Sequence, residues 1–368
     1  MLQTVNRILF SPRLMAVLFL VMAVAMAFGT FIESWYSTET ARIWIYNAWW
    51  FEAIMVFFVI NFIGNIRRYD LLKWNKWPVL VLHLSFILIL VGAFITRYIS
   101  FEGMMPIREG ATENVFYSDK TYLSVLVDGE VQGQPQRKSL EDDLIITEQA
   151  EQSSLPWTTE FNGTPIQVDV VDFTQGARMG VAPEAGGNWF LKLVEAGSGS
   201  RHDHFLESGE VTSIHNVLFS LNRPVDGAVN ITRTDSTLTI DSPFEGSFMR
   251  MADQQSGTVV ADSVQPLMLR SLYTLGSMQF VVPDPPVQGA YRVMPIPENE
   301  QTDNDPDALT VRLSAGDASR EVTLLGGKGR FEYSDPVTIG GLTFRAAYGS
   351  KIHELPFSIT LNDFIAEK

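Results

Sequence analysis

The first hundred residues hold three long apolar runs separated by short polar segments. The runs extend from about 14 to 31, from 49 to 66 and from 78 to 96, and charged residues bound each of them. Each run approaches the ~20 residues that a helix needs to cross the hydrocarbon core of a bilayer. Because lipid offers the backbone no hydrogen-bond partner, a helix is the expected form. We predict three transmembrane helices within a membrane region of residues 1–100.

Positive charges are distributed unevenly around these runs, and this predicts the orientation. Two Lys or Arg precede the first run and four lie between the second and third, whereas the segment between the first and second holds only Arg42. The six are Arg7, Arg13, Arg67, Arg68, Lys73 and Lys76. Such residues favour the cytoplasmic side. We therefore expect a multi-pass protein of the bacterial cytoplasmic (inner) membrane, with its N-terminus inside and its remainder in the periplasm.

The first run has a second interpretation, a cleaved signal peptide. Basic residues at its start and the small-residue triplet Ala23-Val24-Ala25 would permit cleavage. The run is long for a signal peptide, and two further apolar runs follow it. A retained span is therefore favoured.

From about Tyr122 the apolar residues change to near alternation, which is typical of strands. Segments 122–127, 166–171 and 309–313 show it, and Gly and Pro punctuate them. The stretches near 181–187, 197–204 and 295–307 favour loops. We predict an α+β membrane protein whose three N-terminal transmembrane helices precede a large extracytoplasmic domain, residues 101–368, that is antiparallel, β-rich and sandwich-like.

Charge follows the same division of the chain. Residues 1–96 carry seven Lys and Arg against four Asp and Glu, whereas the remainder makes the whole chain acidic, with a net charge of −15. An acidic surface repels phosphates, which argues against a nucleic-acid partner. The chain has no cysteine, which excludes disulfides, thiol chemistry and cysteine-based metal sites.

His83 is the strongest candidate for chemistry. It lies five residues beyond Pro78, inside the third run, roughly 7–8 Å from the cytoplasmic end at ~1.5 Å per residue. An ionisable group in hydrocarbon is costly and suggests function, and a neutral imidazole can bind haem iron. A structural histidine that bonds to a neighbouring helix or to water is the equal alternative. The three runs hold no second histidine, so a bis-histidine iron would need a ligand from another polypeptide.

Other polar residues have weaker claims. Glu52 lies one turn inside the second run, where we expect it to reach headgroup water or to pair with a neighbouring chain. His202 and His204 would share a face of a strand and could clamp a metal with His215, but their Gly- and Ser-rich flank favours a loop. His353 is expected to be structural. We recognise no nucleophile–base motif, so no catalytic residue is assigned.

Several short motifs occur in an order and spacing that resemble the ResB-like (CcsB) family of cytochrome c biogenesis proteins, called System II. They cover about 9–130 and 335–365, while the middle of the chain is compatible only in size and β character. The motifs include Leu9-Phe-Ser-Pro-Arg13, Gly29-Thr30-Phe31-Ile32, Ile45–Phe51, Asn61, Arg67-Arg68, Trp77-Pro78, His83, Gly92, Glu102–Gly110, Gly340–Phe344, Tyr348-Gly349-Ser350 and Leu355–Phe364.

The resemblance implies a role in haem delivery. Such proteins act with a CcsA/ResC-type membrane protein, move haem b outward across the bilayer as a transient cargo, and join it to apocytochrome c. A third-span histidine is a proposed haem axial ligand in the family, and His83 matches it. This implies that the chain is a non-catalytic or accessory subunit of a cytochrome c haem lyase complex.

Two departures from the family qualify this picture. Members usually have a fourth span after the outer domain, and this sequence ends before one. Some relatives carry a cysteine where this chain has Gly64, so this chain cannot itself reduce apocytochrome. A different class of function also fits the residues: a membrane-anchored extracytoplasmic binding or sensor protein in which His83 has no haem role.

Overall fold

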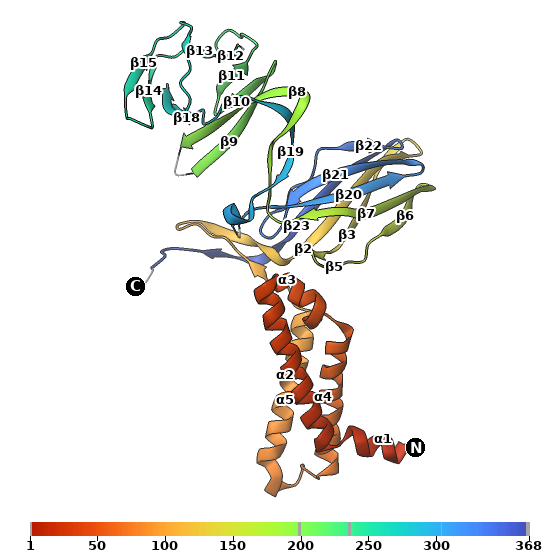
Figure 1. The fold of residues 1–368 in the computed structure, drawn as a ribbon. Coiled ribbons are helices and arrows are strands. Elements are labelled where there is room, and N and C mark those ends of the chain that lie inside the picture. Colours follow the sequence, from red (N-terminus) through yellow and green to blue (C-terminus); the bar gives the residue numbers. More distant parts are fainter. Residues whose placement is uncertain (1, 198–199, 235–236, 303, 366–368) are drawn as a thin grey trace. The chain divides into compact units, whose positions relative to one another are not determined.

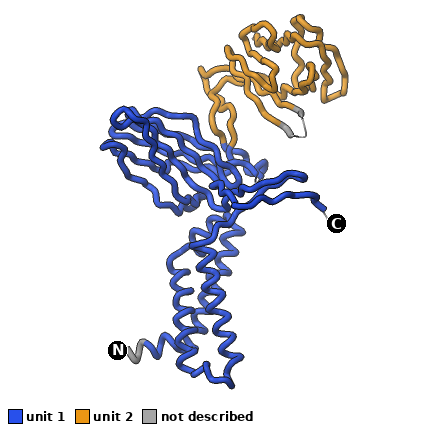
Figure 2. Tube along the Cα trace, turned by 180° about the vertical axis from the view of Figure 1, so that it is seen from behind, with its two compact units in different colours: residues 1–177, 295–368 blue, residues 178–294 orange. Residues whose placement is uncertain are grey.

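The computed structural model describes residues 2–197, 200–234, 237–302 and 304–365. The chain forms two compact units (Figure 2): unit 1 holds residues 1–177 and 295–368, and unit 2 holds residues 178–294. Unit 2 is therefore inserted in the sequence of unit 1. Alternation of apolar residues gave no indication of this division, because it identifies strands and not the core to which each strand contributes.

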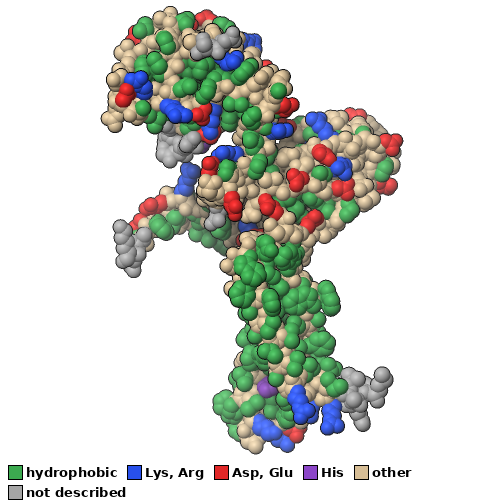
Figure 3. Space-filling view, in the orientation of Figure 1, with side chains coloured by type: hydrophobic (Ala, Val, Ile, Leu, Met, Phe, Trp, Pro, Cys, Tyr) green, Lys and Arg blue, Asp and Glu red, His purple; other side chains and the backbone are tan. Residues whose placement is uncertain are grey.

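Unit 1 begins with the three predicted membrane helices, α2 (Pro12–Trp35), α4 (Trp49–Arg68) and α5 (Trp77–Tyr98), which lie side by side (Figure 1). Each is long and apolar enough to cross a membrane. Their surface is almost continuously hydrophobic (Figure 3). The prediction of three such helices is confirmed. Shorter helices flank them: α1 (Leu2–Leu9), α3 (Thr38–Ala41), η1 (Arg42–Tyr46) and η2 (Trp74–Lys76).

Local chemistry sets where α2 begins and how the bundle packs. The Ser11 hydroxyl accepts a hydrogen bond from the Arg13 amide, and Pro12 occupies the first turn, where its missing N–H costs nothing. Helix α4 lies at the centre of the bundle core, to which it contributes Ile54, Phe58 and Phe62. Helix α5 has no buried residue.

The β part of unit 1 is a sandwich of two antiparallel sheets. One sheet has the order β1-β2-β23-β22 with β3 beside β2, and the other has the order β21-β20-β7-β6. The strands are β1 (Gly103–Met104), β2 (Thr112–Val131), β3 (Gln134–Asp143), β6 (Trp157–Phe161), β7 (Thr164–Thr174), β20 (Asp307–Ala315), β21 (Ala318–Gly326), β22 (Val337–Ile339) and β23 (Leu342–Thr360), with a small pair, β4 (Ile145–Ile146) and β5 (Glu151–Gln152), and a short helix η3 (Glu298–Glu300).

Period-two burial builds the core of this sandwich. In β20 the alternate residues Leu309, Val311 and Leu313 are buried, and they pack in one cluster with residues such as Val125 and Phe344 from the opposite sheet. The predicted antiparallel, sandwich-like arrangement is therefore present in unit 1.

Unit 2 has its own core between two further sheets. One has the order β15-β14-β17-β18-β8-β19 with β9 beside β8, and the other has the order β10-β11-β12-β13-β16, in which β11 and β12 run parallel. The bounds are β8 (Ala177–Gly197), β9 (Ser200–Glu207), β10 (Val211–Ile214), β11 (Val217–Leu221), β12 (Val229–Arg233), β13 (Leu238–Asp241), β14 (Gly246–Arg250), β15 (Ser256–Val259), β16 (Gln265–Pro266), β17 (Ser271–Leu275), β18 (Met278–Val281) and β19 (Val287–Pro295).

The prediction of loops was wrong for two segments, which are strands. Residues 181–187 lie within β8, and 202–204 lie within β9. The glycines that suggested a loop instead permit close strand approach: a Cβ on Gly187 would lie 2.4 Å from the carbonyl oxygen of Gly289. Glycine in a strand can therefore mark a tight backbone contact as well as a turn.

Candidate functional site

His83 lies on α5, and its ring is half-buried against α4. Its Nδ1 is 2.9 Å from the carbonyl oxygen of Val79, one turn earlier. Because a carbonyl can only accept, Nδ1 is the donor in this contact, and in the tautomer that this bond favours the lone pair is on Nε2. The ring meets Phe62 of α4 edge-on, with centroids 5.6 Å apart. A second nitrogen held by a backbone carbonyl is the usual arrangement of a metal-binding histidine, so the residue fits one axial ligand of a haem.

The surroundings of His83 are apolar and open. One turn further along α5, Phe86 stacks on Phe62 at 5.1 Å with nearly parallel rings. Helix α5 also meets α2, where the rings of Phe19 and Phe86 have centroids 6.1 Å apart, but no residue of α5 is buried, so much of its surface is exposed. A planar apolar cargo beside His83 would thus meet aliphatic and aromatic side chains and would need a second protein surface to enclose it.

Glu52 has its partner within the chain, at the end of the bundle nearest the sandwich. Its Oε1 accepts a hydrogen bond from Arg97 at 2.5 Å and another from the Tyr98 hydroxyl at 2.7 Å. Arg97 also donates to the carbonyl oxygen of Tyr46 at 2.6 Å. These contacts join α5 to α4 and to η1, the short helix that precedes α4. Glu52 therefore has a structural role.

The segment between α2 and α4 is bonded to the sandwich. Four of its side chains reach residues far along the chain: Arg42 to Asp119 at 3.2 Å, Thr40 to Thr147 at 3.1 Å, Asn47 to Gln152 at 2.9 Å and Glu39 to Lys328 at 2.6 Å. We call this set the junction. It connects the segment between α2 and α4 to β2, to the β4–β5 pair and to the loop after β21, through charged, hydroxyl and amide groups.

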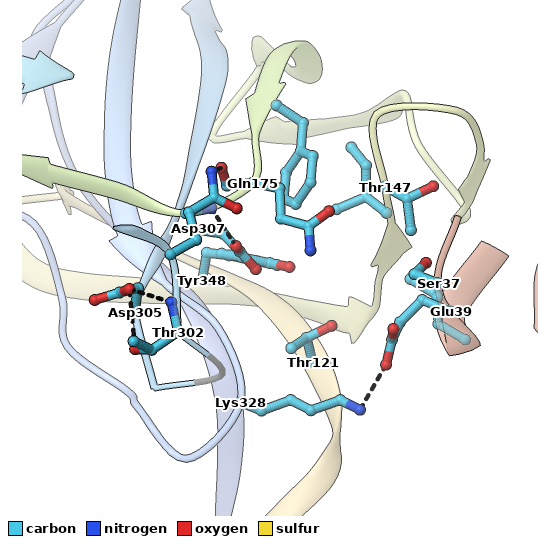
Figure 4. Close-up of a pocket in the computed structure, with 15 residues that line it drawn as sticks. Ser37, Glu39, Thr121, Thr147, Gln175, Thr302, Asp305, Asp307, Lys328 and Tyr348 are labelled. Atoms are coloured by element: carbon cyan, nitrogen blue, oxygen red, sulfur yellow. Dashed lines mark hydrogen bonds and ion pairs between the residues drawn. The ribbon is translucent and has the colours of Figure 1, made fainter. Parts of the chain in front are cut away.

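A polar cavity of about 370 Å³ lies at the junction (Figure 4). Glu39 enters it from α3 and meets Lys328 from the sandwich, while Asp307 and Tyr348 line it from β20 and β23. Asp307 accepts a hydrogen bond from the backbone N–H of Gly176 at 3.0 Å. The carboxylates, hydroxyls and amides that line this cavity could hold a small polar or cationic group.

The pKa values of two carboxyl groups in this junction cavity, Glu39 and Asp307, are shifted in opposite directions. Burial alone would raise the pKa of Glu39, but the hydrogen bond and charge of Lys328 outweigh it, so the pKa lies below the ordinary value. Burial raises the pKa of Asp307, the amide of Gly176 opposes the rise, and the charge of Glu39 adds to it. Burial also raises the pKa of the Tyr348 phenol.

The remaining histidines lie in the two β regions. His204 and His215 both approach Oε2 of Glu195 with Nε2, at 3.2 and 3.1 Å. His202 precedes His204 on β9, not in the predicted loop. Among the described residues, no group of three His, Asp or Glu has the arrangement of a metal site.

His353 lies between two phenylalanine rings of unit 1. Its ring stacks on Phe116 and tilts against Phe101, with centroids 5.1 and 4.6 Å away. Burial lowers the pKa of His353, and the charge of Lys351 adds to the effect. This packing gives His353 a structural role.

The sequence singled out His83, whose role remains a prediction, and Glu52, but it gave no indication of the junction. Lys328, Asp119 and Asp307 resemble ordinary surface charges in the sequence. The only local hint was the Gly-rich run 326–330 around Lys328, which lacks the spacing of a phosphate-binding loop.

No family model matches the chain. Part of it is similar to Protein NrfI of Wolinella succinogenes, with 32% identity over 158 residues. This alignment covers 43% of the present chain and 17% of that protein. The chain therefore corresponds to a minor part of a much longer relative.

Proposed function

We propose that this chain is a membrane component of cytochrome c biogenesis that acts with a CcsA/ResC-type partner to deliver haem for covalent attachment to apocytochrome c. The observation that carries the proposal is the imidazole of His83, which is positioned in an apolar helix long enough to span a membrane, with Nδ1 bonded to the Val79 carbonyl oxygen and Nε2 left to bind iron. The partial similarity to Protein NrfI supports a role in cytochrome c biogenesis.

Haem is the cargo in this proposal, and His83 supplies one of its two axial ligands. Haem iron prefers two ligands on opposite faces of the ring, and the three membrane helices contain no second histidine. The other ligand then comes from the partner protein, whose surface also covers the open face of α5. In this arrangement α5 orients the cargo, α4 supports α5, and the β sandwich faces the periplasm, where attachment takes place.

The test is the absorption spectrum of the complex purified with its CcsA/ResC-type partner. We expect the wild type to show a Soret band and His83→Ala to lose most of it, at equal protein level. Ser85→Ala is the matched control, because Ser85 lies two residues away on α5 and its hydroxyl bonds to the Val81 carbonyl of its own helix. It should retain the band.

Chemical rescue separates ligation from folding. In His83→Gly, added imidazole should restore the Soret band and part of cytochrome c maturation, because a free imidazole can occupy the vacated position. If the band and maturation are unchanged in His83→Ala, His83 has no part in haem handling.

A membrane-anchored sensor is the second candidate, and the junction favours it. A polar cavity that touches both α3 and the sandwich could link ligand binding outside to the membrane helices. Under this function, changes at Glu39 or Lys328 would alter the response, and changes at His83 would not.

A further inference from the structure

Unit 2 contains a second cavity, of about 510 Å³, whose walls are mostly apolar. Its walls include the leucines and prolines Leu238, Leu267, Leu269, Pro266, Pro285 and Pro286. The volume falls within the roughly 300–1,000 Å³ that small-molecule sites occupy. We call it the Arg233 cavity, after the one cation among its described lining residues.

Arg233 is fixed in this cavity by an aromatic ring. Its guanidinium carbon lies 3.5 Å from the ring centroid of Trp189. The Arg233 backbone amide donates to Asn222 at 2.7 Å, which positions the end of β12. The 3.5 Å distance to Trp189 is that of a cation–π contact, and the guanidinium N–H groups are donors that can bond to an anion.

The guanidinium of Arg233 has no carboxylate partner among the described residues, although the region is acidic. Residues 178–294 contain eight Lys and Arg and twelve Asp and Glu. Other arginines of unit 2 do pair, such as Arg250 with Asp253 at 2.6 Å and Arg270 with Asp284 at 3.6 Å. A cation held beside apolar walls, with no carboxylate partner in the part of unit 2 that the structure describes, is suited to a ligand that brings its own negative charge.

We propose that the Arg233 cavity binds a small organic carboxylate with an apolar body. The carboxylate accepts two parallel hydrogen bonds from the Arg233 guanidinium, as the fork geometry of arginine favours. The apolar body packs on the leucines and prolines, and Trp189 holds the guanidinium in place. A simple inorganic anion would satisfy Arg233 but leave the apolar walls unused.

The test compares the binding of a carboxylic acid with the binding of its uncharged amide analogue. Binding of phenylbutyrate and of phenylbutyramide to the full-length protein is measured by saturation-transfer NMR at equal detergent concentration. The acid should bind the wild type about tenfold tighter than the amide, because a hydrogen bond to a charged group is stronger than one between neutral groups. Arg233→Gln should abolish this difference, and Trp189→Leu should reduce it.

Controls make the outcome decisive. Arg292→Gln removes an exposed arginine of the same unit that does not line the cavity, and it should bind the acid as the wild type does. Thermal unfolding of each variant confirms that unit 2 remains folded. Micelles take up the acid equally in all variants, so equal signals from wild type and Arg233→Gln, or equal binding of acid and amide, would overturn the proposal.

Discussion

Helices α4 and α5 are similar in sequence character but differ in how they are packed. Both are long and apolar, yet α4 has seven buried residues and α5 has none. The side chains of Asn61 and Arg68 also anchor α4 to the end of α1 and the α1–α2 connection, and Asn65 bonds to Asn61 within α4. The comparison teaches that apolarity identifies a membrane helix without showing what it contacts. Helix α4 holds the bundle together, and α5 offers a surface, with His83 on it, to lipid or a partner.

The most sensitive test of this comparison exchanges one glycine on each helix for leucine. A Cβ on Gly64 of α4 would lie 1.9 Å from the Phe10 ring, whereas a Cβ on Gly92 of α5 would meet nothing within 4 Å. We expect Gly64→Leu to destabilise the fold by about 1–3 kcal/mol through overpacking. Gly92→Leu should be neutral or slightly stabilising, because leucine favours the helix.

Fluorescence-detected size-exclusion after heating would compare the two leucine variants in the same detergent. A Gly92→Leu variant that unfolds as early as Gly64→Leu would mean that α5 is packed on all sides. That result would remove the contrast between the two helices.

Removing the buried amide of Asn61 should have the next largest effect. Asn61 is fully buried and donates to the carbonyl oxygens of Leu9, at 2.6 Å, and Ser11, at 3.2 Å. Asn61→Leu leaves these acceptors without their donor, so we expect a loss of about 1–2 kcal/mol. Ser85→Ala on α5 should cost almost nothing, and the unfolding temperatures of the two variants provide the measurement.

Breaking the ion pair between Glu52 and Arg97 should have a smaller effect. The pair ties α5 to α4, but its side chains are 40% and 30% exposed, so solvent screens it. Glu52→Gln should lower stability by about 0.5–1 kcal/mol, and the loss should shrink in high salt. A double-mutant cycle with Arg97→Gln measures the coupling energy between the two side chains. A value near zero would mean that this ion pair does not stabilise the packing of α5 on α4.

Acid should weaken the junction that anchors the segment before α4. The pKa of Glu39 is lowered in the folded protein, so its contribution is complete above its ordinary value of 4.5 and is lost as pH falls through the folded value. We expect a modest decrease in stability below about pH 4.5. Glu39→Gln should flatten this part of the pH profile, and an unchanged profile would contradict the assignment.

Asp307 lines the same cavity, but its effect on stability changes with pH in the opposite direction. Its pKa is raised in the folded state, so ionisation opposes folding above the folded pKa, and the penalty is relieved as pH falls toward the ordinary value of 3.8. Asp307→Asn should therefore remove a small stabilising response to acid. Thermal unfolding of both variants across pH separates the two carboxyl groups.

The sequence by itself determined the features that depend on near neighbours. Apolar runs of membrane-spanning length fix α2, α4 and α5, because the backbone must satisfy its own hydrogen bonds in lipid. Alternation of apolar and polar residues predicts strands such as β20. The position of His83 within the third span follows from its distance in residues from Pro78. The haem role of His83 remains a prediction.

Only the tertiary structure decided which distant residues meet. It brought Lys328 to Glu39 across 289 positions, placed Arg233 on Trp189, and made β8 a strand where glycines had suggested a loop. It also separated the β region into two cores. The physical reason is that local patterns record which face of an element is buried, whereas a cavity or an ion pair depends on which other element covers that face.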